Sequence, residues 1–431
     1  MTAEALYAAG PDHIPAEFVS ASHLIYSSPA TLAFNSPGAE GFGVKRAGLA
    51  VPGSVMLLVS PGCCGRNTAL IGAMEAYRNR FFYLLMDEID IVTGRHLEKI
   101  PDAVCEVCRF LDTRPSVVMI CITCVDALLG TDMERVCRKA EERAGLPVRP
   151  CYMYALTREG RRPPMVHVRQ SIYSLLEPAR KHADAVNLLG QFSPYADSTE
   201  LHSLLRSIGI HRIREIARCR TYEEYQEMAQ ANVNLVLNPE ARFAAADFEK
   251  RLRIPSVELR RMYQPDKIRN QYAALGSILG ASFSQDAYEE AARTSIARFR
   301  SLCPDAAFAV GEWMNGDAFE LSLALVREGF SVKEIFGTVT SESFFYLKHL
   351  ARLSPQTEIF SNLEPSMLYY DGHDSGVTIT IGRDAAFHHP NCPAVPWNDE
   401  IQPFGYDGVR RLFDALCAAL SGGKTTRRDQ P

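Results

Sequence analysis

Short apolar runs alternate with helical segments along most of this chain, and that alternation restricts the fold more than any other feature. Such runs, four to eight residues long and separated by helices, are typical of parallel strands buried on both faces. The chain is therefore predicted to be an α/β protein whose parallel sheets are flanked by helices. The expected strands are residues 55–60, 81–86, 116–123, 148–154, 185–190, 212–217, 233–237, 307–311, 332–336 and 376–381.

The same α/β plan recurs at intervals of roughly 110–150 residues, which predicts three Rossmann-like domains. A long helical region over 266–302, broken near Gly280, leads into the third of them. Clefts between such units and at the carboxyl ends of their strands are the usual places for ligands. The predicted parts are an N-terminal arm (1–30), a first domain (31–190), a second (191–300), a third (301–420) and a disordered tail (421–431).

Composition excludes two classes of protein. The 431 residues include 46 Lys and Arg against 51 Asp and Glu, a net charge of −5, which argues against a dedicated nucleic-acid binder. No apolar run is long enough to cross a membrane, and residues 1–10 lack the basic and apolar parts of a secretory signal. We expect a cytoplasmic protein.

The common nucleotide-binding motifs are missing. Residues 422–425 (GGKT) end like a phosphate-binding loop but lack its first glycine, and residues 38–43 (GAEGFG) lack dinucleotide spacing. Any redox role is therefore predicted to depend on electrons from a partner.

Cysteine is the unusual residue: of 12, eight fall between Cys63 and Cys151. Cys63 and Cys64 follow one predicted strand, and Cys124 follows another. Because parallel strands end at the same edge of a sheet, their thiolates are candidates to bind one iron–sulfur cluster. Packing is the alternative for buried cysteines. We assign it to Cys121, inside an apolar run, and to the helical pair at 105 and 108.

Six motifs, in order, resemble those of nitrogenase component 1 and its relatives, which include protochlorophyllide and nickel-sirohydrochlorin reductases and nitrogenase cofactor scaffolds. The resemblance covers nearly the whole chain and implies the family's three-domain fold. Its cluster cysteines correspond to Cys64 and Cys124. The motifs are residues 60–65 (SPGCCG), 87–94 (DEIDIVTG), 124–132 with its GTD, 186–190 (VNLLG), 234–236 (NLV) and 405–408 (GYDG).

Departures from the family pattern restrict the cofactors. Phe34 stands where the family's first cluster cysteine belongs, so a full eight-iron cluster is not expected. Two chains would instead supply Cys64 and Cys124 twice and hold one [4Fe–4S] cluster between them, with Cys63 as a substitute ligand. Asn238 and Val395 stand where the ligands of the iron–molybdenum cofactor belong. That cofactor, and nitrogen fixation on it, are not expected.

His388 and His389 are the candidate proton donors, in a stretch that borders the substrate cavity in the family. A hydrated surface loop is the alternative interpretation of these histidines. Weaker candidates are the His373–Asp374 pair, Trp313 with Glu312 after a strand, and the arginines at 158, 161 and 162.

The resemblance implies a nitrogenase-like oxidoreductase subunit, as a homodimer or a heterodimer with a related chain. An ATP-dependent iron–sulfur reductase would dock near Cys64 and Cys124 and pass electrons to a small-molecule substrate in an inter-domain cavity. The alternatives are a scaffold for metallocluster assembly and a cluster-free protein that binds a small molecule. The substrate, and the choice between Cys63 and Cys121 as a further ligand, remain open.

Overall fold

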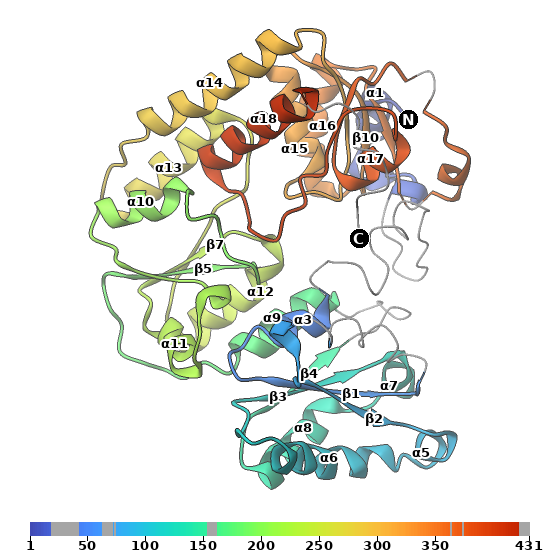
Figure 1. Ribbon diagram of the computed structural model, residues 1–431, viewed down its shortest axis with the longest axis vertical. Coiled ribbons are helices and arrows are strands. Elements are labelled where there is room, and N and C mark those ends of the chain that lie inside the picture. The colour runs from blue at the N-terminus through green and yellow to red at the C-terminus, as the bar shows by residue number, and fades with distance from the viewer. Residues whose placement is uncertain are drawn as a thin grey trace.

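A computed structural model of the chain contains three parallel β-sheets, each flanked by helices (Figure 1). This confirms the predicted fold class. The structure describes residues 1–18, 43–62, 72, 75–152, 162–362, 364–372 and 375–421. Among these, no helix is both long and apolar enough to span a bilayer.

The first unit contains a four-stranded sheet in the order β2-β1-β3-β4. The side chains of β1 and β3 are buried throughout, because helices α6 and α8 cover one face and α3 and α9 the other (Figure 1). Its main elements are α3 (Val44–Gly48), β1 (Val55–Ser60), β2 (Phe81–Leu85), α5 (Glu88–Thr93), α6 (His96–Phe110), β3 (Val118–Ile122), α7 (Cys124–Leu129), α8 (Met133–Ala144), β4 (Val148–Tyr152) and α9 (Pro164–Tyr173).

The second unit contains the sheet β6-β5-β7-β8, and it corrects one predicted boundary. Strand β5 was assigned to the first domain, but it pairs with β6 and β7, so the first sheet ends before residue 185. Asn187 lies opposite Asn234 and donates a 2.8 Å hydrogen bond to its side chain, a buried polar match that favours this pairing. The main elements are β5 (Ala185–Leu189), α10 (Glu200–Ser207), β6 (Arg212–Arg214), α11 (Tyr222–Gln226), β7 (Val233–Val236), α12 (Arg242–Asp247) and β8 (Ser256–Glu258).

Two long helices, α13 (Pro265–Leu279) and α14 (Asp286–Leu302), connect the second and third units. Gly280 ends α13 in a left-handed conformation (φ 69°), which confirms the predicted break.

The third unit contains the sheet β11-β10-β9-β12-β13. The N-terminal helix α1 (Ala3–Ala9) packs on its helix α16, and the Met1 carbonyl accepts a 2.7 Å hydrogen bond from Ile359. The other elements are β9 (Ala307–Val310), α15 (Ala318–Arg327), β10 (Ser331–Phe336), α16 (Phe344–Leu353), β11 (Glu358–Phe360), β12 (Ile379–Ile381), α17 (Arg383–His388), β13 (Ala394–Val395) and α18 (Gly405–Ser421).

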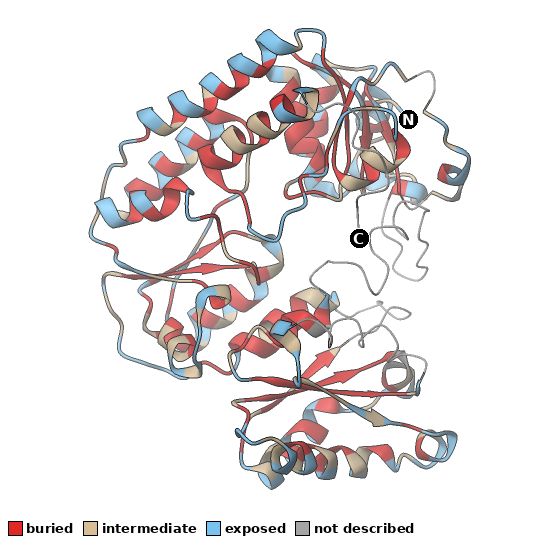
Figure 2. Ribbon diagram, viewed as in Figure 1, coloured by how far each residue is buried: buried red, intermediate tan, exposed pale blue. Residues whose placement is uncertain are grey.

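Hydrophobic contacts join the units. One buried cluster spans the second sheet and the third unit, and another joins one face of the first sheet to the second unit. Figure 2 shows the buried residues concentrated along the strands and on the inner faces of the helices. The second unit therefore shares a core with both of its neighbours.

Candidate functional site

A cavity of about 700 Å³ lies where the three units meet. Most of its wall comes from segments that directly follow the carboxyl ends of strands, which is the usual place for ligands in open α/β sheets. Helix α9 of the first unit completes it with Met165 and Arg169. The wall segments are residues 191–193 after β5, 237–240 after β7, 260–261 after β8, 312–317 after β9, 383 after β12 and 398–400 after β13.

Arg169 is buried in the wall and serves as a brace. Its guanidinium donates two hydrogen bonds to the carbonyl of Gly190 (2.9 and 2.7 Å) and pairs with Glu240 at 2.7 Å. Burial lowers the pKa of Arg169, and Glu240 opposes that shift. These bonds fix the end of β5 at the cavity. A Cβ on Gly190 would lie 2.5 Å from the Cβ of Asn238, so glycine is needed where β5 and β7 end together.

Arg261 differs from Arg169 and Arg260, two other arginines of the wall. Arg260 forms ion pairs with Glu258 and Glu342, whereas no carboxylate of a described residue lies within ion-pair distance of Arg261. Its guanidinium donates one hydrogen bond to the Gln402 amide, at 2.8 Å. Arg261 can therefore meet an acidic group of a bound molecule without first breaking an ion pair to a described residue.

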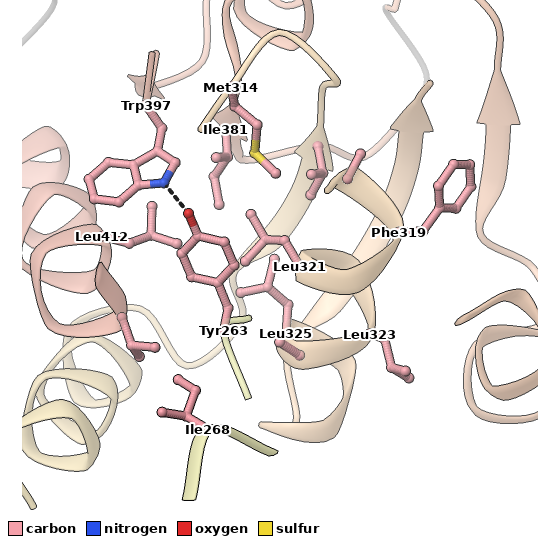
Figure 3. Close-up of a cluster of buried hydrophobic side chains, with 14 of the residues drawn as sticks. Tyr263, Ile268, Met314, Phe319, Leu321, Leu323, Leu325, Ile381, Trp397 and Leu412 are labelled. Atoms are coloured by element: carbon pink, nitrogen blue, oxygen red, sulfur yellow. Dashed lines mark hydrogen bonds between the residues drawn. The ribbon is translucent and has the colours of Figure 1, made fainter. Parts of the chain in front are cut away.

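Buried aromatic residues brace the base of the wall. The Trp397 indole donates a 2.5 Å hydrogen bond to the Tyr263 hydroxyl (Figure 3). That hydroxyl donates in turn to the Asn315 carbonyl. Burial raises the pKa of Tyr263 to about 12, so this hydroxyl remains a donor. The backbone amide of Asn315 also donates to the Trp397 carbonyl at 2.7 Å. The loop after β9 is therefore held through both the N–H and the C=O group of Asn315.

Glu312 and Trp313 line the cavity, as the sequence predicts. The backbone amides of both residues donate to the carboxylate of Asp384 on α17, at 2.9 and 3.2 Å. Asp384 is not among the residues predicted from the sequence. A signal was present, because an acidic residue follows a glycine at the end of each of two predicted strands, at 311–312 and at 382–384.

The cysteines predicted to bind a cluster follow two strands of the first sheet in the sequence. Cys63 and Cys64 lie outside the described residues, but Gly62, which precedes them, comes two residues after β1 ends. Cys124 begins α7, two residues after β3 ends, and β1 and β3 are parallel neighbours with Val59 opposite Ile122. The described backbone thus leads toward both expected ligands at one edge of the sheet.

The surroundings of this edge contain polar groups with unused hydrogen-bonding capacity. The hydroxyls of Ser60 and Thr123 are buried and have no hydrogen-bond partner among the described residues. Such donors, together with thiolate ligands, fit an iron–sulfur group, whose sulfurs accept hydrogen bonds. Asp126, on α7, is held by the ring of His96 at 3.0 Å, and both side chains are fully buried. His96 and Asp126 are not among the residues predicted from the sequence.

His388 and His389 do not line the cavity. The expected surface loop is wrong: His388 ends helix α17, and both histidines are buried at 7% and 5% exposure. His389 lies 2.6 Å from Glu334, while the ring of His388 stacks on Phe336 with centroids 4.7 Å apart. Burial, and then the neighbouring His389, lower the pKa of His388 to about 4. Helix α17 thus places both rings against the side chains of β10.

The other residues singled out from the sequence lie in the cavity wall, in the core, on the surface or outside the described residues. Asn238 lines the cavity, and Val395 is buried in β13. Arg162 bonds to Gln170, while positions 158, 161, 373 and 374 lie outside the described residues, as does position 34. Cys121 is in the core of the first sheet, as expected, and the cysteines at 105 and 108 lie partly buried on α6. Within the described ranges, no three His, Cys, Asp or Glu side chains converge in a manner that would hold a metal ion.

Comparison with known proteins places these features in a family. Residues 40–343 match the family model described as nitrogenase component 1 type oxidoreductase. The fold is similar to a solved structure titled "Nitrogenase Cp1 at pH 6.5", with a TM-score of 0.70, 16% identity, and coverage of 94% of this chain and 93% of that one.

Curated relatives include the nitrogenase iron-molybdenum cofactor biosynthesis protein NifE of Methanococcus maripaludis. It is 23% identical over 231 residues, which cover 52% of this chain and 47% of that protein. NifE of Rhizobium meliloti is 29% identical over 130 residues, or 30% and 27% of the two chains. The chain thus matches about half the length of the first of these relatives, or less.

Proposed function

The chain belongs to the nitrogenase component 1 type oxidoreductases, and from this membership we propose that it is a reductase subunit whose substrate binds in the cavity between its units. The observation that carries the proposal is the cavity itself, because its wall is assembled from strand ends of the second and third sheets. A volume of about 700 Å³ suits a small molecule. Arg261 would meet an acidic group of that substrate, and the Trp313 ring would lie against its flat part.

Electrons would enter through a [4Fe–4S] cluster between two chains, each contributing Cys64 and Cys124, with Cys63 as a possible further ligand. When bound, the cluster would supply single-electron transfer. The support is the shared edge of β1 and β3, together with the unpartnered hydroxyls of Ser60 and Thr123 there. An ATP-dependent iron–sulfur reductase would dock over this edge. The partner chain would be a second copy or a related subunit.

The proposed reaction is not nitrogen fixation. Asn238 lines the cavity where the family's cofactor cysteine would lie, and its side chain caps the amide of Glu240 at 2.9 Å. An amide engaged in a cap is a poor ligand for a metallocofactor. His388 and His389, packed away from the cavity, would act on a substrate only if α17 moved, so proton donation from other residues is favoured.

A scaffold for metallocluster assembly is the second candidate. The curated relatives compared above carry the name of a cofactor biosynthesis protein, which favours this role. A scaffold would use the same cavity for a cargo that it later releases. A cluster-free binding protein is the third candidate.

Iron and acid-labile sulfide, measured with native mass on anaerobically purified chain, test the proposal. We expect about four irons per dimer, lost in C64A and C124A. The matched control is C105A, on the outer helix α6, which should retain the iron. An iron-free monomer after reconstitution would overturn the cluster and leave a small-molecule binding protein.

A second measurement separates a reductase from a scaffold. The iron-loaded chain is mixed with an ATP-dependent iron–sulfur reductase and MgATP, and the cluster is followed by electron paramagnetic resonance. ATP-dependent reduction supports the enzyme. Release of the metal to an acceptor protein without such reduction supports the scaffold.

A further inference from the structure

The ends of two strands of the third sheet closely surround the buried carboxyl group of Asp384. Asp384 is completely buried at the start of α17, between the ends of β9 and β12. A Cβ on Gly311 would lie 1.9 Å from the Asp384 Oδ1 atom, so only glycine leaves room for this carboxyl group. Gly382 has a positive φ of 103°, and its Cβ would lie 3.0 Å from the same oxygen. Two glycines at neighbouring strand ends thus make a cradle for one acid.

A second carboxyl group is linked to it through one amide. The Asn362 side-chain nitrogen, just after β11, donates to Glu312 Oε1 at 2.9 Å and to Asp384 Oδ2 at 2.7 Å. The two carboxyl groups are therefore close neighbours on a single donor. The other oxygen of Glu312 accepts a 2.8 Å hydrogen bond from the backbone of Thr338. The amide oxygen of Asn362 is buried and has no partner among the described residues.

No cation compensates this pair in the contacts of the described residues. Asp384 accepts hydrogen bonds from the backbone amides of Glu312 and Trp313 and from Asn362, all of them neutral donors. Burial first, and then the charge of Glu312, raise the pKa of Asp384 to about 7. Two carboxyl groups in such an arrangement do not both ionise readily at neutral pH.

The other ionisable groups nearby are occupied elsewhere. On the same helix, His388 stacks on Phe336. On β10, Glu334 pairs with His389, and the hydroxyl of Tyr370 also donates to Glu334 at 2.6 Å. Arg383, next to Asp384 in sequence, lines the cavity. The charge that acts most directly on Asp384 is thus that of Glu312.

Only one residue of the pair belongs to the cavity wall: Glu312 lines the cavity and is partly exposed, whereas Asp384 is fully buried and is not one of the lining residues. We infer that Glu312, Asn362 and Asp384 form a proton-holding site, in which the two carboxyl groups share one proton and Glu312 passes it to a molecule bound in the cavity. This inference rests on the proposed function for its substrate class, a molecule that gains protons as it is reduced.

The step balances without a further reactant. The proton leaves the pair and bonds to a basic atom of the reduced substrate. The pair changes from one negative charge to two, while the substrate gains one positive charge. The electrons would come from the cluster of the proposed function, held by Cys64 and Cys124, and solvent in the cavity would return a proton to the pair through Glu312.

The test uses the purified chain alone, without cluster, partner or substrate, so its failure is distinct from failure of the proposed function. Infrared difference spectra between pH 5 and pH 9 report the C=O stretch of a protonated carboxylic acid. We expect one such group to titrate with a midpoint near pH 7, the pKa given above for Asp384. D384N should abolish the titration. E312Q should lower the midpoint by on the order of one pH unit, because it removes the neighbouring charge.

The control variant is E342Q. Glu342 also lines the cavity, but its ion pairs with Arg242 and Arg260 lower its pKa, so the neutral titration should persist. E312Q retains the Asp384 carboxyl group, so it decides the matter even if D384N does not fold. A midpoint that moves in E312Q and stays in E342Q would show that the Asp384 and Glu312 carboxyl groups titrate as a coupled pair. An unchanged midpoint in E312Q, or no protonated acid in the wild type at pH 6, would overturn the inference.

Transfer to D₂O tests access from the cavity. The carboxylic acid band of the native protein should shift within minutes, because Glu312 is partly exposed there. A band that shifts only on unfolding would mean that the proton is sealed in, and it would overturn delivery to the cavity.

Discussion

Two aspartates of this chain are equally hidden from solvent, yet their carboxyl groups have opposite pKa shifts. Asp90 on α5 is 1% exposed, and Asp384 on α17 is fully buried. Hydrogen bonds from Lys99, at 2.6 Å, and then from Arg95 lower the pKa of Asp90 to about 2. The pKa of Asp384 rises to about 7.

The difference shows that cationic partners can outweigh the effect of burial on the pKa of a hidden acid. Asp90 forms a reciprocal capping box with Asp87, the N-cap of α5, and its two cationic partners extend toward solvent from the same segment. In its contacts with described residues, Asp384 has neutral donors and an acidic neighbour. The first arrangement stabilises the fold, whereas the second is suited to hold a proton.

The largest expected effect is on the pH dependence of stability. The folded state binds the Asp384 proton more tightly than the unfolded chain, so this group stabilises the fold at acid pH, and that stability is lost as pH rises from about 4 to about 7. Between pH 4.5 and 8 the loss should be about 3 to 4 kcal/mol, at about 1.4 kcal/mol per unit. Urea unfolding of the wild type and D384N measures the difference. If the unfolding free energy changes with pH equally in both proteins, Asp384 does not have a raised pKa and the contrast with Asp90 is wrong.

Filling the cradle should have the next largest effect. G311A places a methyl group on the Asp384 carboxyl group and should cost up to about 3 kcal/mol of unfolding free energy. The matched variant in the other region is G94A, at the end of α5, where φ is 69° but no atom lies within 4 Å. That variant should lose only about 1 kcal/mol, from backbone strain. A G311A protein as stable as G94A would mean that Asp384 is not confined.

The imidazole of His388 shows how burial affects the pKa of a basic side chain. It is buried against an apolar ring and beside His389, and its pKa falls to about 4. Since the unfolded chain binds this proton more tightly, the neutral ring stabilises the fold above about pH 6.5, and that stability is lost as pH falls toward 4. H388F keeps a ring against Phe336 but has no group to protonate. When pH falls from 7 to 5, its unfolding free energy should therefore decrease by about 2 kcal/mol less than that of the wild type. Thermal unfolding at the two pH values tests this, and an unchanged acid sensitivity would contradict it.

The smallest effect is expected at Asp90. D90N keeps a side chain that can cap α5 but loses its charge, so it should lower the melting temperature at pH 7 by a few degrees. Because the folded pKa of Asp90 is low, the difference from the wild type should shrink as pH falls from about 4 to about 2. A difference that stays constant from pH 7 to pH 3 would show that packing, rather than charge, is lost.

Much of the fold was predictable because its strands are buried on both faces. Runs such as that of β1 leave few alternatives, and glycine at 280 marked the break between α13 and α14. The short edge strands β8, β11 and β13, of two or three residues, were missed, since too few apolar positions distinguish them from loops. The assignment of β5 was wrong because a buried strand looks the same in either sheet; its pairing with β7 decided it.

The site was predictable only in part. Glu312 and Trp313 were expected at a cleft because they follow a strand, and they line the cavity. His388 and His389 were predicted to lie by the cavity or in a surface loop, because no sequence pattern indicated the six-residue helix α17 that buries them. The cluster cysteines at 63, 64 and 124 remain predictions.

The amino-acid sequence alone determined the α/β plan, the family and the kinds of side chain available, because periodicity and motif order are local properties of the chain. The tertiary structure decided which of those side chains meet. Glu312, Asn362 and Asp384 lie on three separate strand ends and have no common sequence signal. The proposed shared proton depends on burial and on neutral donors, which meet in the described residues only when β9, β11 and β12 are brought into one sheet.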